Sequence, residues 1–174
     1  AKEHDIRPII EGGAEAWRVA DRLADANAAV LLDPLVNLPY DFDHLGARLD
    51  NAARLHAAGV TIAFSQRGRG SHNARKVRQL AGNAVAHGLP HDAALAALTH
   101  KPARIFGLDD SGSIEPGKRA DLVLWSGDPL EVTSWAKKVW IDGEAMPMRS
   151  RQTELLQRYL PDNIERPRQY LNTR

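Results

Sequence analysis

Short apolar runs alternate with helix-like segments through the first hundred residues, and this alternation limits the fold more than any other feature of the chain. The runs at residues 6–11, 28–32 and 60–64 are rich in aliphatic and β-branched residues and too short to be helices. Segments 14–26 and 43–58 carry apolar side chains at helical spacing. Because the runs are nearly continuous in apolar character, we expect strands that are buried on both faces, as in a parallel sheet or barrel.

The helix expected at residues 43–58 has an inner stripe of Leu45, Leu49, Ala52 and Leu55, with Asp43 as its N-cap and Gly59 as its C-cap. After the third strand run, further helices are predicted at 73–87 and 90–99, and a short turn of helix at 101–106. The first part of the chain is therefore predicted to hold three strand–helix units joined by crossover connections.

The pattern changes after residue 110. Residues 112–118 read as a turn-rich β segment, and apolar strands are predicted at 120–125 and 138–143. An amphipathic helix is predicted at 150–160, with Leu155, Leu156 and Leu160 facing inward.

Composition excludes several classes of protein. The 174 residues carry a net charge of +1, so no strong field favours nucleic acid, and no apolar segment reaches the length of a membrane span. The chain has no cysteine, which rules out disulfides and thiolate metal sites. It opens on Ala1 rather than methionine, so we expect sequence upstream.

Residues 88–143 form a long and ordered signature. It contains Gly-Leu-Pro at 88–90, Lys-Pro-Ala-Arg-Ile-Phe-Gly-Leu at 101–108 and Gly-Ser-Ile-Glu-Pro-Gly-Lys-Arg-Ala-Asp at 112–121. The signature resembles the C-terminal part of the amidohydrolase superfamily, near its imidazolonepropionase-like and prolidase-like members. The resemblance implies an α/β fold: the C-terminal part of a TIM (β/α)8 barrel at 1–110, part of a small β-sandwich domain at 111–147, and a C-terminal helix and tail at 148–174.

The resemblance also implies metal-dependent chemistry, because the family holds a divalent metal with a His-x-His pair, further strand-end ligands and an Asp after the last strand. This chain contains no His-x-His. Glu11 stands where the family usually has a strand-end His, and Ser65-Gln66-Arg67 stands where it has Gly-Thr-Asp. Arginine cannot ligate a cation, and glutamine cannot act as a base. We therefore expect no cofactor in this chain alone, while a complete parent could hold a divalent metal such as zinc.

Five residues are candidates for substrate binding because they fall at strand ends or at the start of the helix after the last strand. For Glu11 and His72 the competing interpretation is an ordinary helix cap or surface group. A basic cluster at 67–78 is either an anion site before a helix N-terminus or a solvated face. The other six histidines are taken as structural. The candidates are Glu11, Gln66, Arg67, His72 and Asn73.

The favoured function is hydrolysis of a C–N bond, in a cyclic amide or dipeptide, by a parent protein of which this chain is an inactive portion. The alternatives are a non-catalytic family member that binds or scaffolds, and an anion- or nucleotide-binding α/β protein. The expected partners are a small-molecule substrate and the missing N-terminal half of the barrel, or a second copy of this chain; no nucleic acid or membrane is expected. Three strands would leave roughly several hundred Å² of apolar surface uncovered, so we expect no stable monomer.

Overall fold

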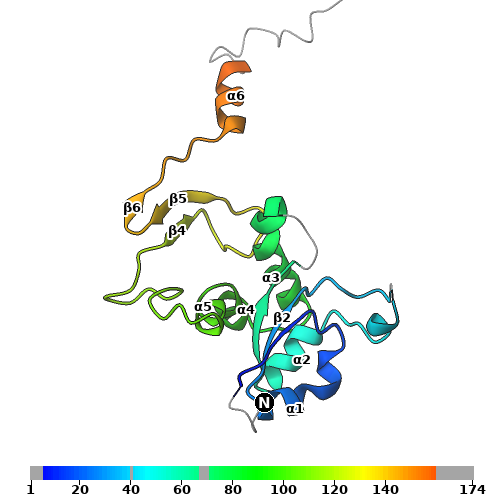
Figure 1. The fold of residues 1–174 in the computed structure, drawn as a ribbon. Helices are drawn as coiled ribbons and strands as arrows, with labels where there is room; N and C mark the ends of the chain where they lie inside the picture. Colours follow the sequence, from blue (N-terminus) through cyan, green and yellow to red (C-terminus); the bar gives the residue numbers. More distant parts are fainter. Residues whose placement is uncertain (1–5, 40, 67–70, 160–174) are drawn as a thin grey trace, which may run out of the picture.

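Two three-stranded sheets, one parallel and one antiparallel, organise the chain (Figure 1). The computed structural model describes residues 6–39, 41–66 and 71–159, with side chains from Ala74 onward in the last range. The parallel sheet has the order β1-β2-β3, and the antiparallel sheet the order β4-β5-β6. Within the described residues neither a closed barrel nor a two-sheet sandwich forms. The strands are β1 (Ile9–Glu11), β2 (Ala29–Leu32), β3 (Thr61–Phe64), β4 (Leu122–Trp125), β5 (Ala136–Ile141) and β6 (Glu144–Ala145).

The parallel sheet confirms the predicted strand–helix alternation. Ile10 pairs with Val30, and Val30 with Ile62, so the three strands run in register. The segments between and after them contain η2 (Ala16–Val19), α1 (Ala20–Asp25), η3 (Phe42–His44), α2 (Asn51–Ala57), η4 (Ser71–Lys76), α3 (Val77–Ala86), α4 (His91–Leu98) and α5 (His100–Ile105).

The two faces of the parallel sheet are covered by different helices. Val30, Leu32 and Ile62 are buried in the main core with apolar residues of η2 and helices α1 to α4. On the opposite face, Ala29 and Ala63 pack against Ile105 of α5. The predicted two-sided burial is therefore right for β2. At β1, Ile9 is 44% exposed, which agrees with the expected incomplete cover of the inner face; β2 is the neighbour of β1 among the described strands.

The helix predicted at 43–58 is wrong over its first half. Leu45 is exposed, and α2 begins at Asn51. Gly46 is held out of a helix because its carbonyl oxygen accepts from Trp17 Nε1 at 2.9 Å and its N–H donates to Glu15. The predicted C-cap is confirmed: Gly59 has a φ of 83°, and Val60 N–H donates to the Leu55 carbonyl as in a Schellman turn.

One arginine fastens the antiparallel segment to the parallel one. Arg78 of α3 donates to the carbonyl oxygens of Pro129, Glu131 and Ser134, at 2.9, 2.6 and 2.9 Å. Its guanidinium also lies 5.0 Å from the centre of the Trp125 ring.

The last described helix, α6 (Arg151–Tyr159), projects away from both sheets (Figure 1). The predicted inward packing of Leu155 and Leu156 is wrong, because both side chains are exposed; Leu160 lies outside the described residues. In the described part of the chain, no helix combines the length and apolar character needed to cross a membrane.

Candidate functional site at the C-terminal edge of the parallel sheet

Polar side chains follow each strand of the parallel sheet at the edge where all three strands end. Glu11 ends β1, Asp33 follows β2, and Ser65 and Gln66 follow β3. Ser65 still belongs to the ladder, since its N–H donates to the Leu32 carbonyl at 3.0 Å. Carboxyl ends of parallel strands are where α/β proteins gather ligand-binding groups. This edge is therefore the candidate site.

Side-chain alternation decides which of these groups face away from the covering helices. Ile10 packs on the helix-covered face, so its neighbour Glu11 faces the opposite side. Ala63 packs on the α5 side, and Ser65, two residues later, shares that face. Glu11 is exposed. Glu11 and Ser65 therefore share the face of the sheet that lies opposite helices α1 to α4.

Asp33 belongs to this edge although the sequence interpretation assigned it only to a loop. It is buried, and its Oδ1 accepts from Leu35 N–H at 3.0 Å, which starts the turn after β2. The signal that could have found it is the one used for Glu11: a carboxylate directly after a short apolar strand run.

Ser65 and Gln66 present buried acceptors without a donor. Ser65 Oγ and Gln66 Oε1 are inaccessible to solvent, and among residues 6–39, 41–66 and 71–159 neither atom has a hydrogen-bond partner. A buried polar group left unpaired costs about 1–3 kcal/mol. Such groups at a strand end are open to donors from water, from a ligand or from residues outside the described part of the chain.

The structure does not show the remaining predicted candidates beside Glu11, Ser65 and Gln66 at the strand-end edge. Arg67, like Arg69 of the basic cluster, lies outside the described residues. The backbone of His72 and Asn73 forms part of η4, which follows β3, but their side chains also lie outside the described part. Arg75 and Lys76 are exposed, and Arg78 is engaged by backbone carbonyls. Within the described residues, the predicted basic cluster therefore consists of two exposed side chains, Arg75 and Lys76, and one arginine, Arg78, that is hydrogen-bonded to backbone carbonyls.

Asn51 ties together the loops that follow β1 and β2. It is 4% exposed; its Oδ1 accepts from Trp17 N–H at 3.1 Å, and its Nδ2 donates to the Gly13 carbonyl at 2.9 Å. Gly13 has a φ of 60°, and a Cβ there would lie 3.1 Å from that of Ala16. These bonds fix the turn directly after Glu11. No sequence pattern indicated this role for Asn51.

Electrostatics near α2 are dominated by one carboxylate. The hydrogen bond from Arg48 is the largest cause that holds the pKa of Asp50 well below its ordinary value; burial opposes it, and a hydrogen bond from Arg54 adds to the lowering. Arg48 donates through Nε and Nη2 at 2.6 and 2.9 Å, and Arg54 through Nε at 2.8 Å.

The polar groups at the strand ends do not make a metal site by themselves. Residues 6–39, 41–66 and 71–159 contain no cluster of three or more His, Asp or Glu side chains that could hold an ion. Asp33 already accepts a backbone hydrogen bond, and β3 contributes only a hydroxyl and an amide. Among the described residues, these strand ends therefore offer fewer side-chain ligands than the three or four that a protein metal site usually has.

A parallel sheet with covering helices, polar strand ends and a following antiparallel segment defines an α/β protein. The family model described as the amidohydrolase family matches residues 13–146. The chain belongs to the amidohydrolase family.

Known proteins agree with this assignment. The chain is 43% identical to the amidohydrolase tasK of Hapsidospora irregularis over 74 aligned residues. These residues make up 42% of this chain and 8% of tasK. The structure of an amidohydrolase from Thermotoga maritima MSB8 matches with a TM-score of 0.74 and 34% identity, over 86% of this chain and 39% of that one. A zinc-bound adenosine deaminase from Xanthomonas campestris shares the fold, with a TM-score of 0.60 and 22% identity over 84% and 40% of the two chains. The chain spans about two fifths of each of these structures.

Proposed function

We propose that this chain supplies the last three strand–helix units of a TIM barrel whose assembled form hydrolyses a C–N bond in a small amide, such as a cyclic amide or a dipeptide. The observation that carries the proposal is the row of Glu11, Asp33 and Ser65 at the carboxyl ends of three parallel strands, in a chain of the amidohydrolase family. Residues 111–147 contribute to an accompanying β-sandwich. The chain alone is inactive, because the rest of the barrel is needed to enclose a substrate.

Barrel completion is supported by the two free edges of the parallel sheet. Within the described residues β1 and β3 each have one neighbour, β2. The Ser65 N–H points toward β2, so by alternation the backbone groups of Ile62 and Phe64 point toward the free edge of β3. A groove of about 480 Å³ runs beside Val60, Thr61 and Ile62, with α4 and α5 along its other side. A further parallel strand fits this edge.

Within the site, we assign proton transfer to Glu11. It is an exposed carboxylate on the face that would line the barrel. Ser65 and Gln66 accept hydrogen bonds from N–H groups of the substrate or of the completing strands. Arg67, His72 and Asn73 are proposed to bind polar groups of the substrate.

Hydrolysis by the assembled protein tests this proposal. The chain joined to the polypeptide that completes its barrel is offered N-acyl amino acids, cyclic amides and dipeptides, and amine release is measured. We expect turnover by the assembly and none by the chain alone. Glu11→Gln should lower kcat/KM by about 100-fold, the usual share of a general acid or base. Glu144→Gln on β6, an exposed carboxylate away from this edge, is the matched control and should leave kcat/KM unchanged.

A non-catalytic binding module is the second candidate. It is favoured by the end of β3, where an amide and a hydroxyl stand in place of the family's carboxylate. An assembled barrel that hydrolyses no amide in the panel, yet melts at a higher temperature with one of them bound, would select this alternative over the enzyme.

A further inference from the structure

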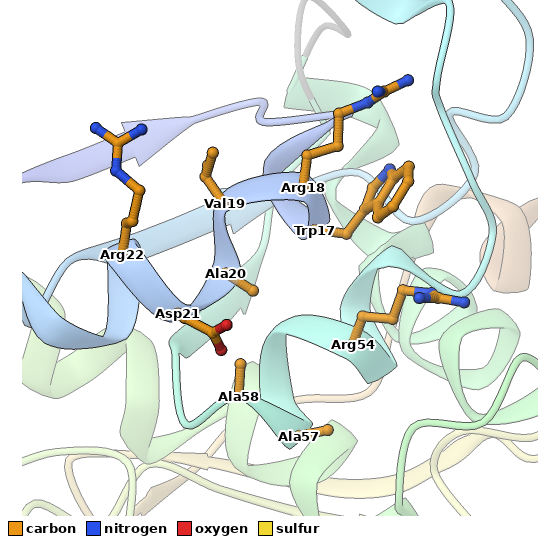
Figure 2. A pocket seen from close by; sticks show the side chains of 9 residues that line it. All are labelled: Trp17, Arg18, Val19, Ala20, Asp21, Arg22, Arg54, Ala57 and Ala58. Carbon is orange, nitrogen blue, oxygen red and sulfur yellow. The ribbon is translucent and has the colours of Figure 1, made fainter.

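A groove lies between helices α1 and α2 on the outer side of the protein, away from the strand-end site (Figure 2). It has a volume of about 590 Å³. Its floor is made of small apolar side chains, among them Ala20, Ala57 and Ala58. Both helices are consecutive units of the parallel sheet and cover its helix-side face, so strands added at β1 or β3 leave this groove open.

The walls of the groove are predominantly cationic. Arg18, Arg22 and Arg54 line it, against a single carboxylate, Asp21. Figure 2 shows Arg22 at one end of the groove and Arg18 and Arg54 at the other, beside Trp17. Positive charge therefore stands at both ends of an extended, open surface.

The guanidinium groups at one end are held in place by a shared aromatic ring. The central carbons of Arg18, Arg48 and Arg54 lie 5.0, 5.2 and 5.4 Å from the centre of the Trp17 indole. Stacked guanidiniums keep their N–H edges available for carboxylates. The indole itself is fixed by its hydrogen bond to the Gly46 carbonyl.

Carboxylates of the chain use only part of this donor capacity. Arg18 bonds Glu15 through Nε at 2.7 Å, and Arg54 bonds Asp50 through Nε at 2.8 Å. Among the described residues, neither arginine places its terminal N–H groups in a further ion pair. About half of each side chain is exposed, at 55% and 47%. Guanidinium groups that are already held in place and still have N–H donors to offer suit carboxylate ligands that bind in a bidentate way.

We propose that this groove is a docking surface for an acidic peptide segment of a partner protein. The alanine floor admits a peptide backbone close to α1 and α2, and carboxylates placed toward both ends meet Arg22 on one side and Arg18 and Arg54 on the other. A single small anion would engage only one end and leave the floor uncovered. The proposal is independent of the hydrolytic activity.

Binding of a labelled hexaglutamate peptide to the full chain, followed by fluorescence anisotropy, tests the proposal. We expect saturable binding that weakens as salt is raised, and no binding of hexalysine. Replacing Arg18 and Arg54 together by glutamine should raise Kd by about tenfold or more, as expected for lost charge-assisted hydrogen bonds. The matched control replaces Arg104 and Arg151 by glutamine, which lowers the net charge by the same amount. These two exposed arginines do not line the groove, so Kd should change by less than about twofold.

A second variant keeps all the arginines and tests whether binding needs the open groove or only the positive charges beside it. Ala57 is exposed on the floor, so Ala57→Trp should fill the groove while the fold survives, which circular dichroism checks. Loss of hexaglutamate binding in this variant supports the docking surface. The proposal is overturned if Ala57→Trp binds like the parent, if free glutarate competes as well as the peptide, or if the control pair weakens binding as much as Arg18 and Arg54. Binding that disappears as the chain self-associates would assign the groove to a second copy and also overturn it.

Discussion

At the scale of single residues, Asn51 should be the most sensitive polar position near the strand-end edge. Asn51→Ala removes the partners of Trp17 N–H and the Gly13 carbonyl in a buried place, so we expect a loss of about 1–3 kcal/mol in the free energy of unfolding. Urea denaturation measures it. The control is Asn83→Ala on α3, where an exposed amide bonds only the Gln79 carbonyl one turn earlier; its effect should stay within about 0.5 kcal/mol. Equal effects would contradict the role assigned to Asn51.

Asp50 gives the chain a pH dependence of definite sign. Its pKa in the folded state is lowered from the ordinary 3.8, first by the Arg48 hydrogen bond and then by Arg54. A lowered pKa contributes stability that is present above about pH 4 and is lost as pH falls through the folded-state value. The pair is partly exposed, so the contribution is about 0.2–1 kcal/mol.

Comparison of Asp50→Asn with the parent from pH 7 to pH 2 checks this sign. The parent should be more stable by a constant margin from pH 7 to about pH 5, and the margin should close below about pH 4 as Asp50 is protonated. The control is Asp25→Asn, which replaces an exposed carboxylate at the end of α1. A margin that grows on acidification would refute the assignment.

The residues that sequence analysis found and missed differ in a physical way. The positions of Glu11 and Gln66 at strand ends could be predicted because each stands at the end of an apolar strand run, and a strand end needs no knowledge of distant contacts. Asn51 could not, since its partners lie 34 and 38 positions earlier in the chain. The donor that Gln66 Oε1 lacks is not indicated by any local pattern either.

At the scale of elements, Arg78 joins α3 to the connection between β4 and β5. Its planar group reaches three carbonyl oxygens while lying over Trp125, which the ammonium of lysine cannot reproduce. Arg78→Lys should therefore loosen residues 126–135 and raise their amide hydrogen exchange. We expect a cost of about 1–2 kcal/mol in unfolding free energy. Arg75→Lys in the preceding η4, an exposed site, should leave both quantities unchanged; protection that persists in Arg78→Lys would show that other contacts hold the connection.

A helix could be predicted where apolar residues at helical spacing are followed by a C-cap glycine. The residue at which the helix begins could not be predicted. The stripe of Ala52 and Leu55 and the end at Gly59 were read correctly, because spacing and a positive φ are local properties. The onset failed because tertiary bonds to Trp17 and Glu15 hold Gly46 in a loop. The apolar positions of α6 were also read correctly as a stripe. Their burial could not be predicted, since amphipathic spacing does not specify what covers the stripe.

At the scale of the whole molecule, helices cover one face of the parallel sheet fully and the other face only in part. Helices α1 to α4 cover one face, while α5 covers the opposite face only around Ala29 and Ala63. Ile9 remains substantially exposed beside the free edge of β1. A parallel sheet with open edges and a partly bare inner face gains stability by pairing with further strands.

The isolated chain should therefore self-associate or melt without a sharp transition, and should become a stable species only with the polypeptide that completes its barrel. Light scattering over a dilution series measures the first outcome, against the monomer mass of 19.2 kDa. Ile9→Lys places a charge on the bare inner face at the β1 edge and should lower the associated fraction. Ile114→Lys adds the same charge in an exposed turn, where it should leave association unchanged. A monodisperse 19.2 kDa parent chain with a cooperative melt at micromolar concentration would show that three strands and α5 already close the fold, and that no further barrel strands are required.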